Sequence, residues 1–150
     1  MAYILETRRR TKRYGKALTA VDGLDLSIRA GICFGLLGPN GAGKTTTLEM
    51  IEGILSPTAG EVLFHGQPVG KDFKEKVGIQ FQSTALPDHL LVGEVLTLFA
   101  SFYRRHADLA ELRALCDLDE LWTRDASKLS GGQRQRLLLA LAIVNDPELV

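Results

Sequence analysis

The first part of the chain alternates between apolar and polar positions in the manner of half-buried β-strands. Two stretches, Ile4–Tyr14 and Ala20–Ile28, show this two-residue period. The second stretch slips in phase near Gly23, which predicts a β-bulge. The next run, Ile32–Leu37, is apolar without interruption and is typical of a strand buried on both faces. These patterns together predict a β-rich N-terminal region.

A helix is predicted directly after a glycine-rich loop. From Thr45 onward, Leu48, Ile51 and Leu55 recur at helical spacing and share one face. Gly53 and the turn-forming sequence SPTAG end this helix. The order of strand, glycine-rich loop and helix is the one in which phosphate-binding loops occur.

The remaining chain is predicted to contain two more strands and then mainly helices. The strands are Gly60–Gly66 and Lys76–Gln82, whereas leucines recur at three- and four-residue steps between residues 84 and 128. That helical region is either an insertion in an α/β domain or a separate bundle. A last helix is predicted at Gly132–Asn145, followed by Pro147 and the start of an extended segment. This helix is apolar on nearly every side, which favours burial against the core.

The loop Gly38–Thr45, GPNGAGKT, fits the phosphate-binding pattern G-x-x-x-x-G-K-[ST]. Its glycines let successive backbone N–H groups point at a polyphosphate, and the N-terminus of the following helix offers further N–H groups. Lys44 would reach the β- and γ-phosphates, and the Thr45 hydroxyl would bind Mg²⁺. The alternative is a chance glycine-rich turn, but the strand before the loop and the helix after it favour nucleotide binding.

A second anion-binding pattern occurs near the end of the sequence. Ser130 precedes two glycines, Gly131 and Gly132, at a predicted helix start. A hydroxyl followed by two backbone amides can bind a phosphate. A plain N-cap serine followed by a permissive glycine pair is the simpler interpretation when this segment is considered alone.

The composition argues against only a few function classes. The chain has 150 residues, about one domain, and its 18 basic and 18 acidic side chains cancel. A net charge of zero gives no support for attraction to nucleic acid or to an anionic membrane. The longest apolar run, Leu137–Val144, is far shorter than the about 20 residues of a membrane-spanning helix. Both cysteines, Cys33 and Cys116, are interpreted as buried thiols. The basic run Arg8–Arg13 is interpreted as the solvated face of a strand, and a nucleic-acid contact is the alternative.

Four segments taken together resemble the nucleotide-binding subunit of an ATP-binding cassette (ABC) transporter. They are Gly38–Thr46, Leu55–Gly66, Phe81–Leu96 and Lys128–Val150, and the last contains the family signature LSGGQ. The resemblance implies an α/β fold: a phosphate-loop NTPase core of the ABC type with an N-terminal antiparallel β subdomain and an α-helical subdomain insertion. It also implies that the C-terminal part of the fold is absent. The implied divisions are residues 1–83 for the β-rich core, 84–128 for the helical subdomain and 129–150 for the signature and its helix.

The resemblance also implies roles for particular positions. Tyr14 corresponds to the aromatic residue that stacks on adenine, and Gln82 to a glutamine that reaches Mg²⁺ or the attacking water. Gln80 is a nearby rival, but Gln82 is preferred because it ends the predicted strand. Lys44 and Gln82 are expected to serve catalysis, and Thr45 and Gln82 to bind the metal. The expected ATP-binding residues are Tyr14, Gly38, Pro39, Asn40, Gly41, Ala42, Gly43, Lys44, Thr45 and Thr46. The signature residues, expected to act on a nucleotide held by another subunit, are Ser130, Gly131, Gly132 and Gln133.

The implied cofactors are ATP and Mg²⁺. The implied partners are a second ABC subunit, as a homo- or heterodimer, and a membrane-spanning permease subunit, with no nucleic acid expected. This places the subunit in the cytoplasm, on the inner face of the membrane through the permease. The segment Phe81–Leu96 resembles drug-efflux exporters of the ABC-2 type. A soluble ABC ATPase that acts on nucleic acid or ribosomes, and a non-hydrolysing ATP-binding fragment, are the alternatives.

In the family, an apolar strand ending in aspartate and then glutamate follows the signature helix. The aspartate holds Mg²⁺ through water and the glutamate is the general base for hydrolysis. The sequence ends at Val150, where that strand is expected to begin. The resemblance therefore implies a chain without the catalytic base.

Overall fold

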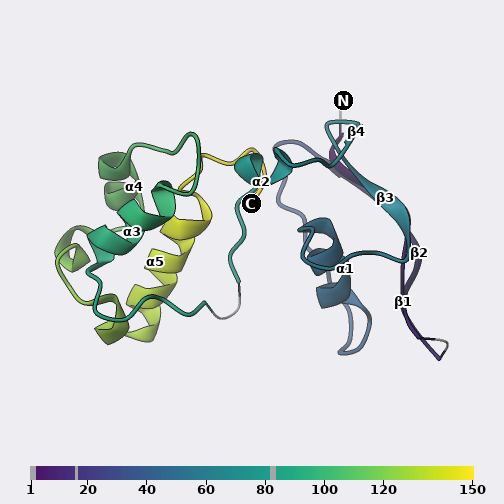
Figure 1. Cartoon of the computed structure of the whole chain (residues 1–150), viewed down its shortest axis with the longest axis horizontal. Helices are drawn as coiled ribbons and strands as arrows, with labels where there is room; N and C mark the ends of the chain where they lie inside the picture. The colour runs from purple at the N-terminus through teal and green to yellow at the C-terminus, as the bar shows by residue number, and fades with distance from the viewer. Residues whose placement is uncertain (1–2, 16, 82–83) are drawn as a thin grey trace. The chain divides into compact units, whose positions relative to one another are not determined.

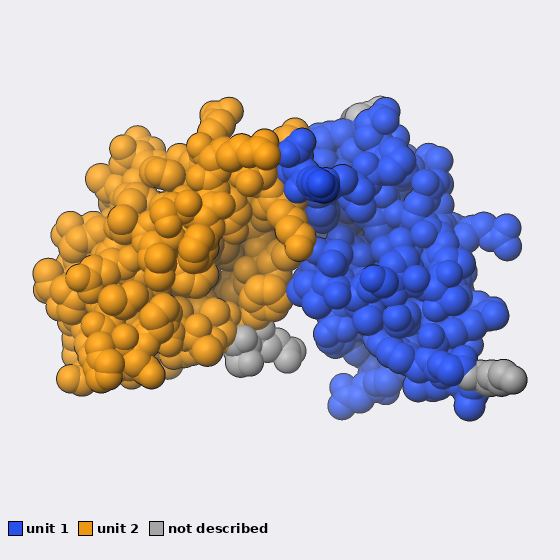
Figure 2. Space-filling model, viewed as in Figure 1, with its two compact units in different colours: residues 1–73 blue, residues 74–150 orange. Residues whose placement is uncertain are grey.

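The structure, a computed structural model, describes residues 3–15, 17–81 and 84–150. Its chain divides into two compact units, residues 1–73 and residues 74–150, which Figure 2 distinguishes by colour. Among the described residues, no helix is both long and apolar enough to cross a membrane.

The first unit is a four-stranded antiparallel sheet with one helix beside it (Figure 1). The strand order is β2-β1-β3-β4. The bounds of these strands are β1 Tyr3–Tyr14, β2 Leu18–Arg29, β3 Ala59–Phe64 and β4 Gln67–Pro68. The helix α1 covers Lys44–Ile51. The predicted strands around Ile4–Tyr14, Ala20–Ile28 and Gly60–Gly66 are thus confirmed, and so is the helix after the glycine-rich loop.

The predicted bulge near Gly23 is also confirmed. The pairing of β1 with β2 passes from Arg10 opposite Leu24 to Lys12 opposite Val21, so β2 has an extra residue there. The Gly23 backbone N–H donates to Thr11 Oγ1 at 3.0 Å, which satisfies a donor that the irregular ladder leaves free.

Ile32–Leu37 is not a strand, contrary to the sequence prediction. Ile32, Phe34 and Leu37 are exposed, and Leu37 retains 92% of its accessible surface. A strand buried on both faces requires neighbouring strands and covering layers, and none of the described segments pairs with this run. Cys33 belongs to the same run and is exposed, so its predicted burial is also wrong. Cys116 is buried as expected, and burial raises the pKa of its thiol.

The apolar face predicted for α1 is only partly correct. Its buried residues are Thr47, Met50 and Ile51, whereas Leu48 is exposed. The helix also ends earlier than Leu55, because Gly53 adopts a left-handed conformation with φ of 73°.

The second unit is a small helical bundle with its own core. Its elements are α2 Phe73–Lys76, which begins on the last residue of the first unit, α3 Val92–Ala100, α4 Leu109–Leu115, the 3₁₀-helices η1 Asp119–Leu121 and η2 Ala126–Lys128, and α5 Gly131–Ala142. Val95, Leu118 and Leu137 are completely buried in this core. The predicted burial of Leu137–Val144 is confirmed except at Leu139, which is exposed, and Ile143, which is half-buried.

The predicted strand Lys76–Gln82 is reduced to a single bridge. Val77 pairs in parallel with Leu149, and the Gly78 N–H donates to the Leu149 carbonyl at 2.8 Å. The expected extended segment after Pro147 therefore does pair with another segment, but over one residue only. The lack of further strands on either side among the described residues explains why no longer ladder forms.

The most crowded backbone contact in the first unit lies between β3 and a bulge in β1. Gly60 has φ of 83°, and a Cβ placed on it would lie 2.4 Å from the Arg9 carbonyl oxygen and 2.5 Å from that of Arg8. Arg9 itself is left-handed, with φ of 46°. Only glycine satisfies both the conformation and the spacing at position 60.

We predict that Gly60→Ala lowers the free energy of unfolding by about 3 kcal/mol or more, because the methyl group must displace two backbone carbonyls. Gly66→Ala is the matched control: Gly66 has φ of 74° but open space around the added Cβ. That control should cost only about 1 kcal/mol, for the left-handed backbone alone. Urea denaturation followed by circular dichroism measures both, and equal losses would contradict the steric argument.

Candidate nucleotide-binding site

The loop before α1 is shaped by two left-handed glycines. Gly41 has φ of 83° and Gly43 has φ of 81°, and between them the Ala42 N–H donates to the Pro39 carbonyl at 3.2 Å. A Cβ on Gly43 would lie 2.4 Å from the carbonyl oxygen of Ala20 in β2. The loop is therefore curled tightly and rests directly on the sheet, as the glycine positions of the motif predict.

The N-terminus of α1 has no side-chain cap and no acidic residue in its first turn. Gly43 is the N-cap residue, and its carbonyl accepts from the Thr47 N–H at 2.8 Å. The first N–H groups of a helix have no partner inside the helix. Those of Lys44, Thr45 and Thr46 are thus available to an anion, and the helix dipole favours negative charge at this place.

Lys44 closes the loop on itself. Its Nζ donates to the carbonyl oxygens of Gly38 at 2.7 Å and Pro39 at 2.8 Å. The ammonium group therefore lies at the mouth of the loop, on the same side as the first turn of α1. A phosphate oxygen there would compete with these two neutral acceptors and would form a stronger, charge-assisted bond.

The oxygen ligand that this site offers is suited to a magnesium ion bound together with phosphates. Thr45 is exposed in the first turn of α1, where its hydroxyl is free to bind a metal. Among the described residues no group of three or more His, Cys, Asp or Glu side chains could hold a metal ion. Mg²⁺ commonly takes few protein oxygens and several from water and phosphate, so one hydroxyl in this position is adequate.

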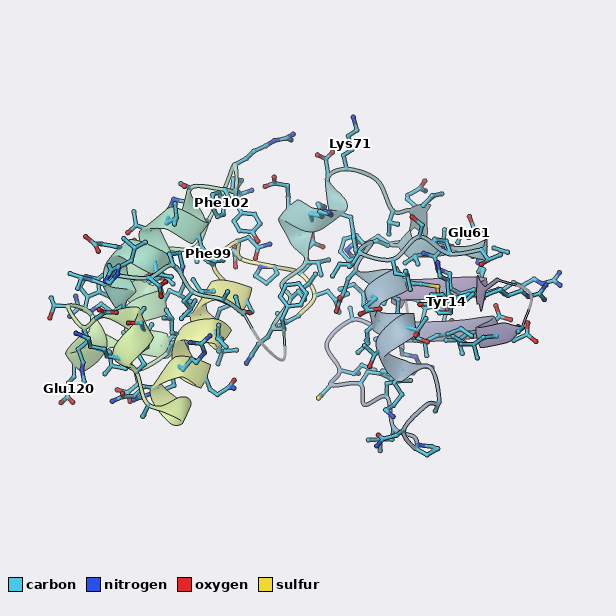
Figure 3. The ribbon with its side chains drawn as sticks, turned by 60° about the horizontal axis from the view of Figure 1, so that its bottom comes forward. Tyr14, Glu61, Lys71, Phe99, Phe102 and Glu120 are labelled. Atoms are coloured by element: carbon cyan, nitrogen blue, oxygen red, sulfur yellow. The ribbon has the colours of Figure 1, made fainter. Side chains whose placement is uncertain are left out.

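Tyr14 ends β1 in the same unit as the loop (Figure 3). Its ring is exposed, and Lys12 Nζ lies 5.2 Å from the ring centroid. Lys12 is itself held by a bond from Nζ to the Ser56 carbonyl at 2.7 Å. An exposed ring of this kind offers a face on which a nucleobase can stack.

Ser130 is the N-cap of α5 and forms a capping box with Gln133. The Gln133 N–H donates to Ser130 Oγ at 3.4 Å, and the Ser130 N–H donates to Gln133 Oε1 at 2.9 Å. The simpler interpretation of this serine is therefore realised in the structure. These two side chains satisfy each other, as S-x-x-Q at a helix start predicts.

Neither backbone conformation nor a close contact with a described residue explains the glycine pair after Ser130. Neither Gly131 nor Gly132 adopts a positive φ, and nothing lies within 4 Å of a Cβ built on either residue. Glycine in a helix costs about 1 kcal/mol relative to alanine. The pair therefore leaves open space and exposed backbone at the start of α5.

Gln82 lies outside the described residues, but the segments on both sides of its position contact α5. Gln80 Nε2 donates to Gln135 Oε1 at 2.9 Å, and Arg134 donates to the Thr84 carbonyl. The amide nitrogen of the rival residue Gln80 is thus engaged by α5. Arg134 and Gln135 were not singled out from the sequence, because no local pattern links them to residues 80–84.

Asn145 is a further residue that sequence reasoning missed. It is buried, and its Nδ2 donates to the carbonyl oxygens of Val77 at 3.1 Å and Glu75 at 3.2 Å. A Cβ on Gly78 would lie 1.9 Å from the Ala142 carbonyl oxygen, so this segment passes directly against the end of α5. Asn145 and Gly78 thus hold residues 75–78 against the end of α5.

The family model described as "ABC transporter" matches residues 21–150. The chain belongs to this family. The match covers the phosphate loop and the signature alike, and the ABC fold class predicted from the sequence is confirmed by the solved structures that the chain resembles.

Curated relatives of this ABC chain include proteins named "Nod factor export ATP-binding protein I". The one from Burkholderia orbicola (strain AU 1054) is 38% identical over 154 residues, which cover 97% of this chain and 50% of that protein. The one from Burkholderia pseudomallei (strain 1710b) is 42% identical over 147 residues, covering 93% and 48%. The chain thus spans about half the length of the curated relatives that it matches.

Solved ABC structures show the same fold. CbiO1 from Clostridium perfringens, described as part of the ABC transporter complex cbiONQ, aligns with a TM-score of 0.79 at 27% identity, over 98% of this chain and 63% of that one. MJ0796, described as a dimeric bacterial ABC transporter cassette, aligns with a TM-score of 0.80 at 28% identity, over 95% and 70%.

The predicted ABC site residues fall into two groups. The phosphate loop, the first turn of α1 and Tyr14 belong to the first unit, and the signature residues belong to the second. Within each unit the local geometry suits the expected chemistry: a curled loop with free amides in one, and an open helix start in the other.

Proposed function

We propose that this chain is the ATP-binding part of a nucleotide-binding subunit that powers an ABC membrane transporter. The observation that carries the proposal is the geometry at the start of α1. Uncapped helix N–H groups, two left-handed glycines and the Lys44 ammonium group lie within one short loop. This combination is suited to the β- and γ-phosphates of Mg·ATP.

The residues of the site then have separate roles. Lys44 neutralises the β- and γ-phosphates, and the Thr45 hydroxyl binds Mg²⁺. Gly38–Thr46 surround the polyphosphate, and Tyr14 stacks on adenine. Gln82 would sense the γ-phosphate and the metal, and the contacts of Gln80 and Thr84 with α5 would link it to the signature helix.

The signature Ser130–Gln133 acts on ATP held by a second subunit. The open space around Gly131 and Gly132 supports this role, because close approach of another molecule is the remaining physical reason for a glycine pair there. Two subunits related in this way, identical or different, would close face to face over two ATP molecules. The complete site would therefore require a dimer. In the single subunit, the capping box holds the Ser130 hydroxyl at the helix start.

The relatives support a proposal for transport direction and location. The curated relatives are named as export proteins, and one structural neighbour is described as part of a transporter complex. We infer that this subunit serves an exporter and works in the cytoplasm beneath a membrane-spanning permease. The two subunits would close when they bind ATP and reopen afterwards, and this motion would change the conformation of the permease.

Hydrolysis requires a general base that the proposed site does not contain. In the family this base is a glutamate in a strand after the signature helix, and Val150 precedes the corresponding position. We infer that residues 1–150 bind ATP without turning it over.

We predict that Lys44→Ala weakens ATP binding by roughly 10- to 100-fold, the effect of losing a charge-assisted hydrogen bond to phosphate. Titration with a fluorescent ATP analogue in the presence of Mg²⁺ measures the affinity. Lys71→Ala is the control, since Lys71 is exposed and points into solvent (Figure 3). Unchanged affinity in Lys44→Ala would refute the proposed site.

The purified 150-residue chain should release no phosphate from saturating Mg·ATP above background. A phosphate-release assay checks this, with Lys44→Ala as the blank. Turnover that Lys44→Ala abolishes would show that the chain contains its own catalytic base.

Ser130→Arg should leave ATP binding to the monomer nearly unchanged and abolish ATP-driven dimerisation. The added side chain would fill the space above Gly131 and Gly132 that the partner's nucleotide must occupy. Analytical ultracentrifugation with and without ATP separates the two states. Equal loss of binding and dimerisation would contradict the division of roles between the loop and the signature.

A further inference from the structure

Arg10 is a buried arginine in a strand segment that the sequence predicts to be solvated. Its residue exposure is 6%, while Arg8 and Arg9 on the same strand are exposed. The bulge in β1 causes this difference. Leu5 and Thr7 point inward as the alternation requires, but the left-handed Arg9 shifts the phase, so that Arg10 and not Arg9 faces the interior.

The Arg10 guanidinium joins three segments of the first unit. Nη1 donates to the carbonyl of Gly60 in β3 at 2.9 Å, and Nη2 donates to the carbonyl of Met50 at 3.0 Å. Met50 lies in the last turn of α1. Its carbonyl is one that the helix leaves free, because the Ile54 N–H donates to Glu49 instead.

The environment of Arg10 is a costly one for a charge. Both of its acceptors are neutral carbonyls, its Nε has no partner, and no carboxylate of the described residues forms an ion pair with it. Burial lowers the pKa of the guanidinium for this reason. An aliphatic side chain would fill the same space without that cost, so filling the core does not account for an arginine.

The position of Met50 suggests what the arginine does. The helix α1 is short and has no side-chain cap at its N-terminus, where the phosphate loop ends. Its eight residues form a rod of about 12 Å, so a shift at the C-terminal end is transmitted to the N-terminal end. A cation at a helix C-terminus also interacts favourably with the helix dipole.

We propose that Arg10 is a positioning residue for the phosphate loop: by binding the Met50 carbonyl from the bulge of β1, it sets the placement of α1 and hence of the N–H groups and Lys44 at the other end of the helix. The proposal rests on the proposed function, because it assigns Arg10 a role in phosphate binding. It predicts that substituting Arg10 lowers the affinity for the phosphates of the ligand. The contribution of the adenine base to the affinity should not change.

The test compares Arg10→Leu and Arg10→Lys with the exposed control Arg8→Leu. Affinities of the full chain for Mg·ATP and for inorganic tripolyphosphate are measured by displacement of a fluorescent ATP analogue, and folding is checked by circular dichroism. In Arg10→Leu both affinities should fall about tenfold, because the phosphate-binding groups are misplaced. Arg10→Lys, which keeps a donor for the Met50 carbonyl, should be intermediate, and Arg8→Leu should match the unchanged chain.

A merely structural Arg10 would give a different result. Arg10→Leu would then unfold at a lower temperature but would bind both ligands with unchanged affinity in its folded state, and this outcome overturns the proposal. If Arg10→Leu does not fold, Arg10→Lys decides: weakened binding of both ligands supports the proposal, and unchanged binding overturns it. Failure of the proposed function is recognised separately, because Lys44→Ala would then leave both affinities unchanged.

Discussion

The contact between Gly60 and the backbone of Arg8 and Arg9 determines how the first unit is organised. It brings β3 so close to the bulge of β1 that no side chain fits between them. The bulge in turn changes which residues of β1 face inward and places Arg10 at the end of α1. The helix then carries the phosphate loop at its other end, where Gly43 rests on the Ala20 carbonyl of β2. The Arg10 hydrogen bond to Met50 and the Gly43 contact with Ala20 therefore connect the sheet to the two ends of the helix.

Much of this arrangement could be predicted from local patterns. Alternation predicted β1 and β2, the phase slip predicted the bulge at Gly23, and the glycine-rich motif predicted the curled loop before α1. These features depend on neighbouring residues, which is why a single sequence indicates them. The phosphate loop is the clearest case, because its conformation follows from glycines at fixed positions.

The failed predictions concern properties that distant residues determine. Ile32–Leu37 has the composition of a central strand, but a strand also requires partners, and the described chain supplies none. The basic run was interpreted as the solvated face of a strand, but Arg10 is buried because a bulge shifted the register. The contacts of Asn145 with Val77 and of Gln80 with Gln135 join segments that no motif connects. Such contacts become visible only when the chain is folded.

The single parallel bridge between Val77 and Leu149 has a consequence for the order of folding. Parallel pairing between segments so far apart in the chain carries a large loop-closure entropy, which a lone bridge cannot offset. The cost falls once the helical core has formed, because α5 and Asn145 then hold Leu149 near Val77. We therefore expect the bridge to form after the helical core. In a ribosome-bound chain, Val77 would have no bridge partner until α5 and Leu149 had been synthesised.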